Sequence, residues 1–529
     1  MLSSASPRLS HLATGGQHRT AQALALLRRH WLLAVLLVAG LVLRALTQFA
    51  YQPALVYIDT LKYLYGVYPG SDPLGYRVLL KVFLTVGDLG FVAAVQHLLG
   101  LAMAVALYAV LLRRGVWRWL AALAAAPVLL DAYQLQMEQM IMPDVWFEAL
   151  LVAGLVLLLW SPVVTTRFAV LAGVVLGASA TFKSLGQVLI LPAVAYLVVS
   201  GLQGPGAGWR RALTSSATLA AAFVLPILLY CGASAAITGH FWLAHGQPNS
   251  GRMAAAADCA TLKLPPAVRP LCPTPAEQAQ GPDWLEHSGK SPLHAAPLPP
   301  GISRAEAIAA LSSAVQHQQP GRVVVSIARD AVRLFALTRD QAPGIVPVSR
   351  WQFQTSYPVY PPWVTVSPRH VIVAGLQWRV FGPFRPTPLR PSYGGHAQVN
   401  VDLARFLRSY QLNGGFTPGP LLLLVTLAGL AGTVLALMGL GRTRRSSGPG
   451  SRPLALGSLL FTATAVVVLL APDVLEFSWR YQLPAVVTLP PAGVLGICAI
   501  VSRYRARGQS RGERVIEASD VAWSPPAAS

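Results

Sequence analysis

Long apolar runs alternate with short polar turns over most of the 529-residue chain. A helix needs about 17–25 mostly apolar residues to cross the hydrocarbon core of a bilayer. Ten runs reach or approach that length, at 31–49, 89–112, 116–134, 145–160, 168–182, 186–201, 213–237, 420–440, 453–471 and 481–502. The fourth to sixth are short and can be divided differently, which allows eight to eleven spans. We predict an all-α integral membrane protein, a polytopic helical bundle of about ten transmembrane helices.

The polar stretches divide the chain into five parts. These are a tail (1–30), a transmembrane module (31–237, with a first outer loop at 50–88), a large segment (238–419), C-terminal transmembrane helices (420–502) and a second tail (503–529). The large segment is rich in proline and glycine and is long enough for a small domain or a lid over the membrane face. It contains only two cysteines, Cys259 and Cys272. A disulfide in this segment therefore has one pairing within the chain.

Charge predicts the orientation. The chain has 41 Lys and Arg residues against 20 acids, a net charge of +21, and only 12% charged residues. Soluble proteins have about 25%, and the basic residues lie beside apolar runs, which indicates membrane topology rather than nucleic-acid binding. With the N-terminus inside, every inside turn is basic, whereas the outside turns carry Asp59, Asp72, Asp131, Glu138, Asp144, Asp473 and Glu476. We predict a multi-pass protein of the cell membrane with both termini in the cytoplasm and 238–419 outside.

The sequence contains none of the motifs of soluble enzymes, such as a phosphate-binding GxxxxGK[ST] loop, HExxH, paired CxxC or GxSxG. The remaining chemistry belongs to acids and bases at the outer ends of the spans. Asp59, in the loop that follows the first span, could deprotonate a hydroxyl or hold a metal ion or an amine. The same loop could instead be a solvated connector whose tyrosines lie at headgroup level.

Other outer residues have similar alternatives. Glu138 and Asp144 could bind a divalent cation through oxygen ligands, or simply mark an outside loop. Lys183, in a tight turn between two apolar runs, would suit a phosphate partner, or it could extend to the membrane surface. Arg480 could bind phosphate with two hydrogen bonds or anchor a helix end. Arg44, late in the first span, has the same alternatives, and we favour anchoring.

Four short motifs occur in a characteristic order. They are Tyr57-Ile58-Asp59 followed by Asp72-Pro73-Leu74-Gly75-Tyr76; Glu138-Gln139-Met140 through Asp144; Lys183-Ser184-Leu185-Gly186 with Leu191-Pro192; and Arg480-Tyr481 with Pro484. In this order, and at the predicted outer ends of the spans, these motifs resemble those of the GT-C membrane glycosyltransferases. The resemblance is to the branch of the protein O-mannosyltransferases and the aminoarabinose transferases of lipid A. The resemblance covers roughly the first 200 residues and the last 60. One departure is Thr60, because the family often has Asp-Glu where this chain has Asp59-Thr60.

The resemblance implies that residues 31–237 form a catalytic module. It would pass a sugar from a polyprenyl-phosphate donor to an extracytoplasmic glycan, lipid or protein acceptor in a bacterial cell envelope. Asp59 would be the catalytic base; Lys183, Arg480 and Tyr481 would bind the donor phosphate; and Glu138, Asp144 and Asp72 would bind the acceptor or a divalent metal, Mg²⁺ or Mn²⁺. One alternative is a transporter or flippase of a lipid-linked saccharide or organic ion, and another is a non-catalytic scaffold.

Overall fold

The computed structural model describes residues 25, 27–57, 59–65, 72–203, 207–244, 249–357, 365–366, 370–373, 376–379, 394, 397–439 and 451–521. These residues are mostly helical, and the predicted all-α membrane fold is confirmed. Seven helices in this part of the chain are long and apolar enough to cross a bilayer. They are α2 (Trp31–Ala50), α5 (Leu89–Arg113), η1 with α10 (Ser184–Leu189 and Ile190–Gln203), α11 (Trp209–Thr238), α19 (Gly419–Met438), α20 (Ser451–Asp473) and the first part of α21 (Pro484–Val521).

The other three predicted runs also form helices. Two of them are shorter, α8 (Asp144–Leu159) and α9 (Thr166–Phe182). The run predicted as one span at 116–134 is broken into α6 (Arg118–Leu130) and α7 (Ala132–Gln139), which are bent by 50°. The break falls at Asp131, whose carboxylate accepts a hydrogen bond from the Tyr133 amide and pairs with Arg339 at 3.0 Å. Counting α6 and α7 as one broken span gives eight, and the count of ten stays a prediction.

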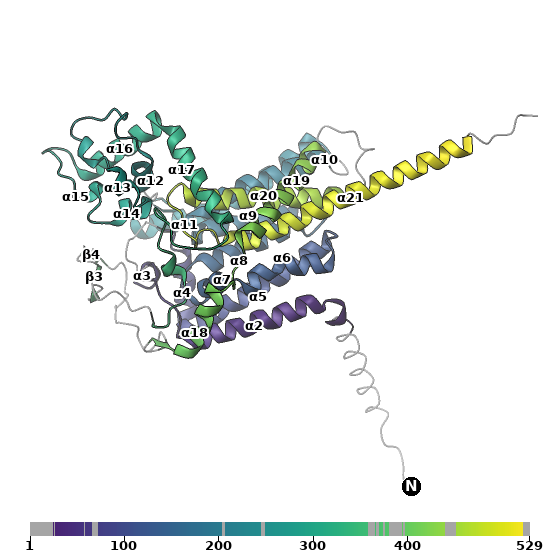
Figure 1. The fold of residues 1–529 in the computed structure, drawn as a ribbon, viewed down its shortest axis with the longest axis horizontal. Helices are drawn as coiled ribbons and strands as arrows, with labels where there is room; N and C mark the ends of the chain where they lie inside the picture. The colour runs from purple at the N-terminus through teal and green to yellow at the C-terminus, as the bar shows by residue number, and fades with distance from the viewer. Residues whose placement is uncertain are drawn as a thin grey trace, which may run out of the picture.

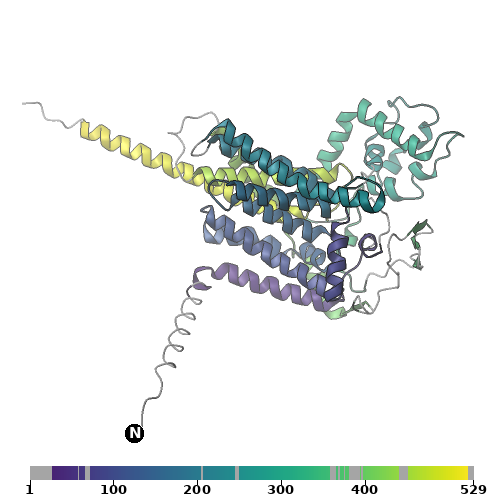
Figure 2. The ribbon, with the colours of Figure 1, turned by 180° about the vertical axis from the view of Figure 1, so that it is seen from behind.

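The bundle has two distinct ends (Figures 1 and 2). At one end, α2 begins and α21 leaves the bundle. At the other lie α3 (Thr60–Tyr65), α4 (Gly75–Val86), α7, α18 (Val401–Leu412) and the helices of the large segment. The start of α2 and the end of α21 therefore lie on the side opposite the helices of the large segment. The assignment of these sides to cytoplasm and exterior remains a prediction.

Close contacts between helices rely on small residues. A Cβ atom on Gly177 of α9 would lie 2.0 Å from the backbone oxygen of Phe223 in α11, and one on Gly496 of α21 would lie 2.1 Å from that of Ala428 in α19. Neither distance is sterically possible, so glycine is required for these backbones to approach. Small residues at such contacts are typical of helix packing in membranes, where apolar lipid provides no hydrophobic force to bring helices together.

The first part of the large segment forms a small helical unit with its own core. Its helical elements are α12 (Ser250–Ala256), η2 (Arg269–Leu271), α13 (Pro275–Gln278), α14 (Pro282–His287), α15 (Pro292–Ala295), α16 (Arg304–Gln318) and α17 (Pro320–Val332). Met253, Leu271, Leu285, Leu311 and Val315 are buried in this core. The chain then continues through η3 (Arg333–Phe335) and η4 (Val348–Trp351).

The few strands all lie near this end of the molecule. Strand β1 (Tyr51–Gln52) pairs antiparallel with β5 (Gln398–Val399), so the end of α2 is joined to the end of the large segment. Strands β2 (Thr365–Val366), β3 (His370–Val373) and β4 (Leu376–Arg379) form an antiparallel sheet. The first outer loop and the large segment are therefore connected through backbone hydrogen bonds.

Cys259 and Cys272 are joined by a disulfide in the helical unit, with 13 residues of sequence separation. Closing a loop of about 15 residues stabilises a fold by about 3 kcal/mol in the chain-entropy model. We expect the double substitution Cys259→Ser/Cys272→Ser to destabilise this unit by about 2–3 kcal/mol. Limited proteolysis should then cut within 250–318 at lower denaturant concentration than in the wild type, whereas Cys231→Ser should leave this cleavage unchanged. Equal resistance of the double variant and the wild type would contradict this prediction.

Candidate active site

The first outer loop is fastened to the turn between α7 and α8. The Leu55 amide donates to the Gln139 carbonyl at 2.9 Å, and the Ile141 amide donates to the Leu55 carbonyl at 3.0 Å. The Thr60 hydroxyl donates to the Ile141 carbonyl and accepts from the Tyr57 amide, both at 3.0 Å. Thr60, where the motif departs from the family pattern, therefore holds the backbone on both sides of Asp59 in place.

Asp59 lies between two cations. Its Oδ2 accepts a hydrogen bond of 2.7 Å from Arg480, and its Oδ1 lies 3.3 Å from Lys62 Nζ. Burial alone would raise the pKa of Asp59, but Lys62 and Arg480 outweigh it and lower the pKa from 3.8 to about 2. The ion pairs therefore stabilise the fold above pH 3.8 and are lost only as the pH falls towards 2. Asp59 is ionised at physiological pH, with 23% of its side chain still exposed.

Arg480 connects Asp59 to a second carboxylate, Asp144. Its Nε and Nη2 donate to the two oxygens of Asp144 at 3.0 and 2.9 Å, in a bidentate pair. Asp144 Oδ1 also accepts from Lys183 Nζ at 2.8 Å. Asp144 is the first residue of α8 and Lys183 directly follows the end of α9. The three charges are therefore fixed by helix ends and by the turn before α21.

Six charged side chains form one alternating chain at this end of the bundle. In order they are Asp72, Lys62, Asp59, Arg480, Asp144 and Lys183, with neighbours paired at 2.7–3.3 Å. Arg480 and Asp144 are 6% and 4% exposed, whereas the other four are 16–28% exposed. Three acids and three bases cancel in formal charge. We call these six residues the charged cluster; its centre is a buried ion pair, and its outer members are partly exposed.

Aromatic rings surround the cations of this cluster. Lys183 Nζ lies 5.0 Å from the ring centroid of Tyr481 and 5.9 Å from that of Phe147. The Arg480 guanidinium lies 5.5 Å from the Tyr481 and Trp351 rings. Cations over aromatic faces are stabilised by the ring quadrupole. Tyr481 thus lies against both cations that were predicted to bind phosphate.

The structure brings together most of the predicted site residues. Asp59, Asp72, Asp144, Lys183, Arg480 and Tyr481 lie in or against the charged cluster. Sequence reasoning gave no role to Lys62 and Trp351. Lys62 has a usable signal, because it follows Asp59 by three residues in the same loop, but Trp351 lies in the large segment, where no motif marks it.

Glu138 lies apart from the charged cluster, inside the bundle. It is fully buried, with Arg44 Nη2 at 2.7 Å and His97 Nδ1 at 3.0 Å from its two oxygens. Arg44 also donates to the backbone oxygens of Val128 and Leu129. The Arg44 guanidinium therefore joins α2 to α6 and α7 in the interior, and the anchoring role favoured for it stays a prediction. The acceptor or metal role of Glu138 stays a prediction.

We expect Glu138→Gln to act mainly on stability. Removing one partner of a buried pair leaves the other charge unpaired and costs about 3–5 kcal/mol. The thermal unfolding midpoint in detergent should therefore fall clearly below that of the wild type. Asp402→Asn is the control, because Asp402 is 89% exposed and pairs only at the surface. Normal stability with loss of activity in Glu138→Gln would instead favour the acceptor or metal role.

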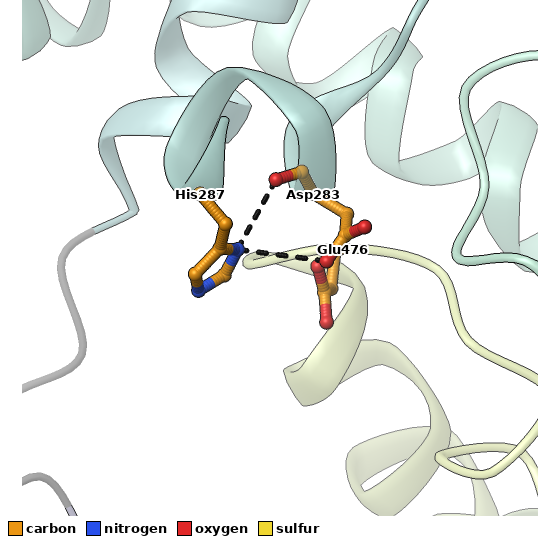
Figure 3. Close-up of side chains that lie close together, drawn as sticks. All are labelled: Asp283, His287 and Glu476. Carbon is orange, nitrogen blue, oxygen red and sulfur yellow. Dashed lines mark hydrogen bonds and ion pairs between the residues drawn. The ribbon is translucent and has the colours of Figure 1, made fainter. Parts of the chain in front are cut away.

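The carboxylates that were predicted to bind a metal already have basic side chains as partners. Asp144 is paired with Arg480 and Lys183, Asp72 with Lys62, and Glu138 with Arg44 and His97. In this arrangement these carboxylates do not fit a shared divalent ion. A different group could hold one, namely Asp283, His287 and Glu476 (Figure 3).

The fold and the site define a multi-pass, all-α membrane protein with a charged cluster at the bundle end that carries its large segment. No protein-family model and no curated protein matches the chain.

Solved structures that are similar to it include the following two. The archaeal oligosaccharyltransferase AglB from Archaeoglobus fulgidus, in complex with an inhibitory peptide and a dolichol-phosphate, has a TM-score of 0.41 and 13% identity, over 92% of this chain and 52% of that one. The S. cerevisiae protein O-mannosyltransferase Pmt1-Pmt2 complex, bound to the sugar donor, has a TM-score of 0.32 and 18% identity, over 39% of this chain and 33% of that one.

Both similar structures are GT-C membrane glycosyltransferases, the family that the sequence motifs resemble. This chain spans about half the length of AglB and about a third of the length of the O-mannosyltransferase chain. Both TM-scores are below 0.5, so neither similarity supports a conclusion about function. The evidence for function is the geometry of the site.

Proposed function

We propose that the protein is an inverting membrane glycosyltransferase. It would transfer a sugar from a polyprenyl-phosphate donor to a hydroxyl or amine of an extracytoplasmic acceptor. The observation that carries this proposal is the charged cluster, in which an ionised carboxylate, Asp59, lies beside the cations Arg480 and Lys183. A base and two phosphate-binding cations within one partly exposed site are what such a transfer needs.

The donor phosphate would bind to Lys183 and Arg480. Both share the carboxylate of Asp144, which holds them side by side. As the bond between the anomeric carbon and the phosphate oxygen breaks, the leaving phosphate keeps the electron pair and gains charge. Cations already placed at that position stabilise the transition state more than the ground state. Tyr481, against both cations, would form the wall of the phosphate site.

Asp59 would accept the proton of the acceptor as the acceptor oxygen or nitrogen attacks the anomeric carbon. A carboxylate whose pKa is about 2 is a weak base. Binding of the donor would change this, because Arg480 would turn part of its hydrogen bonding from Asp59 to the phosphate. With one of its cations engaged by an anion, the pKa of Asp59 would rise towards its ordinary value. Donor binding would thus activate the base before the acceptor reacts.

Asp72 would act at the acceptor side of the site. It lies at the opposite end of the charged cluster from Lys183 and holds Lys62 at 2.8 Å. Lys62, paired with both Asp72 and Asp59, would keep the base oriented while the acceptor hydroxyl or amine approaches. In this proposal the charged cluster faces the cell exterior, and both chain termini lie in the cytoplasm, as the positive-inside pattern predicts.

A transfer assay distinguishes this proposal from a transporter or flippase. Purified protein in detergent should move radiolabelled sugar from a polyprenyl-phosphate donor to an added acceptor or to water. Flipping or uptake that is seen only in sealed vesicles, with no transfer in detergent, would instead support the transporter.

A further inference from the structure

A second group of ionisable side chains joins the helical unit to the loop between α20 and α21. Asp283 and His287 lie one turn apart on α14, and Glu476 comes from the loop (Figure 3). One possible ligand atom from each lies within 4.8 Å of the other two. Two elements almost two hundred residues apart in sequence therefore bring a nitrogen and two oxygen ligands to one point.

The spacing is close to that of a metal site. Bonds of about 2.0–2.2 Å to a tetrahedral Zn²⁺ place its ligand atoms about 3.4 Å apart. His287 Nδ1 and Asp283 Oδ1 already lie 3.5 Å apart. The Glu476 oxygen would have to approach by about 1.4 Å at most, which rotation of its side chain can supply, and His287 Nδ1 would give up its 3.1 Å hydrogen bond to the Asp283 backbone oxygen.

The surroundings also suit a bound cation. Asp283 directs its other oxygen, Oδ2, towards Arg350 Nη2 at 3.5 Å, so one oxygen can bind a metal while the other keeps this outer partner. Ligating carboxylates are usually held by such partners. His287 is 65% exposed, which leaves room for water in the remaining position and a path for the ion.

We propose that Asp283, His287 and Glu476 bind one divalent transition-metal ion of the Zn²⁺ class. An imidazole with two carboxylates favours zinc over Mg²⁺ or Ca²⁺, which take oxygen ligands. The ion would fasten α14 to the loop that carries Arg480, four residues after Glu476. Trp351, which follows Arg350, lies against Arg480, so the site would also stabilise one wall of the charged cluster.

The test uses full-length protein in detergent, without a polyhistidine tag, stripped with a chelator and then titrated with ZnCl₂. We expect one tightly held zinc per chain by elemental mass spectrometry after desalting, and an unfolding midpoint raised by at least ~2 °C. Mg²⁺ at the same concentration should do neither. His287→Ala and Glu476→Gln should each weaken zinc binding by at least about 10-fold.

His317→Ala is the matched control, because His317 is an exposed histidine of α16 bonded to the Ser313 carbonyl. This variant should bind zinc like the wild type, and so should Asp59→Asn. Absence of bound zinc in the wild type, or equal binding in the wild type and His287→Ala, would overturn the proposal. Metal content and unfolding are measured without a sugar donor, so this outcome is independent of whether transfer occurs.

Discussion

Asp59→Asn is expected to fold, insert and bind donor, yet to lose transfer by about 10²–10⁴-fold, the usual contribution of a general base. The asparagine keeps the shape of the side chain but cannot take up the acceptor proton. Stability should fall only modestly, by the contribution of the Asp59 ion pairs, because Lys62 retains Asp72 and Arg480 retains Asp144. The measurement is the initial rate of sugar transfer, with the unfolding midpoint recorded on the same preparation.

The control for this prediction is Asp402→Asn, which removes an exposed carboxylate on α18. It should transfer sugar at the wild-type rate. Wild-type activity of Asp59→Asn would rule out Asp59 as the base. A large loss of stability in Asp59→Asn would show that its carboxylate mainly supports the fold.

Arg480→Ala is expected to reduce both transfer and stability. Loss of a preorganised donor to a developing oxyanion usually lowers kcat by about 10²–10³. The substitution also leaves Asp144, a carboxylate that is 4% exposed, with Lys183 as its remaining ion-pair partner. Removal of one partner from a buried ion pair costs about 3–5 kcal/mol. Transfer rates and unfolding midpoints should therefore both fall.

Arg480→Lys separates these two effects. Lysine restores the positive charge but cannot make the bidentate pair with Asp144 or reach Asp59 at the same time. We expect it to recover part of the stability and little of the transfer. If Arg480→Lys transferred sugar at the wild-type rate, the proposed role of the guanidinium in phosphate binding would be wrong.

Hydropathy, together with the distribution of charged residues between the two sides of the membrane, predicts much of the fold and of the site. The apolar runs locate the long helices, because a bilayer imposes a minimum apolar length on every span. Sidedness then predicts that Asp59, Asp144, Lys183 and Arg480 gather at one end, and the structure places them within ion-pairing distance. Short polar motifs at span ends are informative because ionisable groups are costly within the membrane.

The depth of a side chain within the bundle, and the pairing of residues that are far apart in sequence, could not be predicted in the same way. The sequence predicts that Glu138 is an acid of an outer loop. The bend at Asp131 instead turns α7 into the bundle, where Arg44 pairs with Glu138. At this bend Asp131 pairs with Arg339, which comes from the large segment. No local pattern pairs Asp283 with Glu476 either, because their approach depends on how the helical unit packs against the α20–α21 loop.

The central claim is that Lys183 and Arg480 bind the phosphate of a polyprenyl-phosphate donor, and native mass spectrometry of the gently solubilised protein tests it most directly. The account predicts a bound polyprenyl phosphate, free or sugar-linked, on the wild type and on Asp59→Asn. It predicts loss of that adduct from Lys183→Ala and Arg480→Lys. An adduct retained equally by all four proteins, or absent from the wild type, would contradict it.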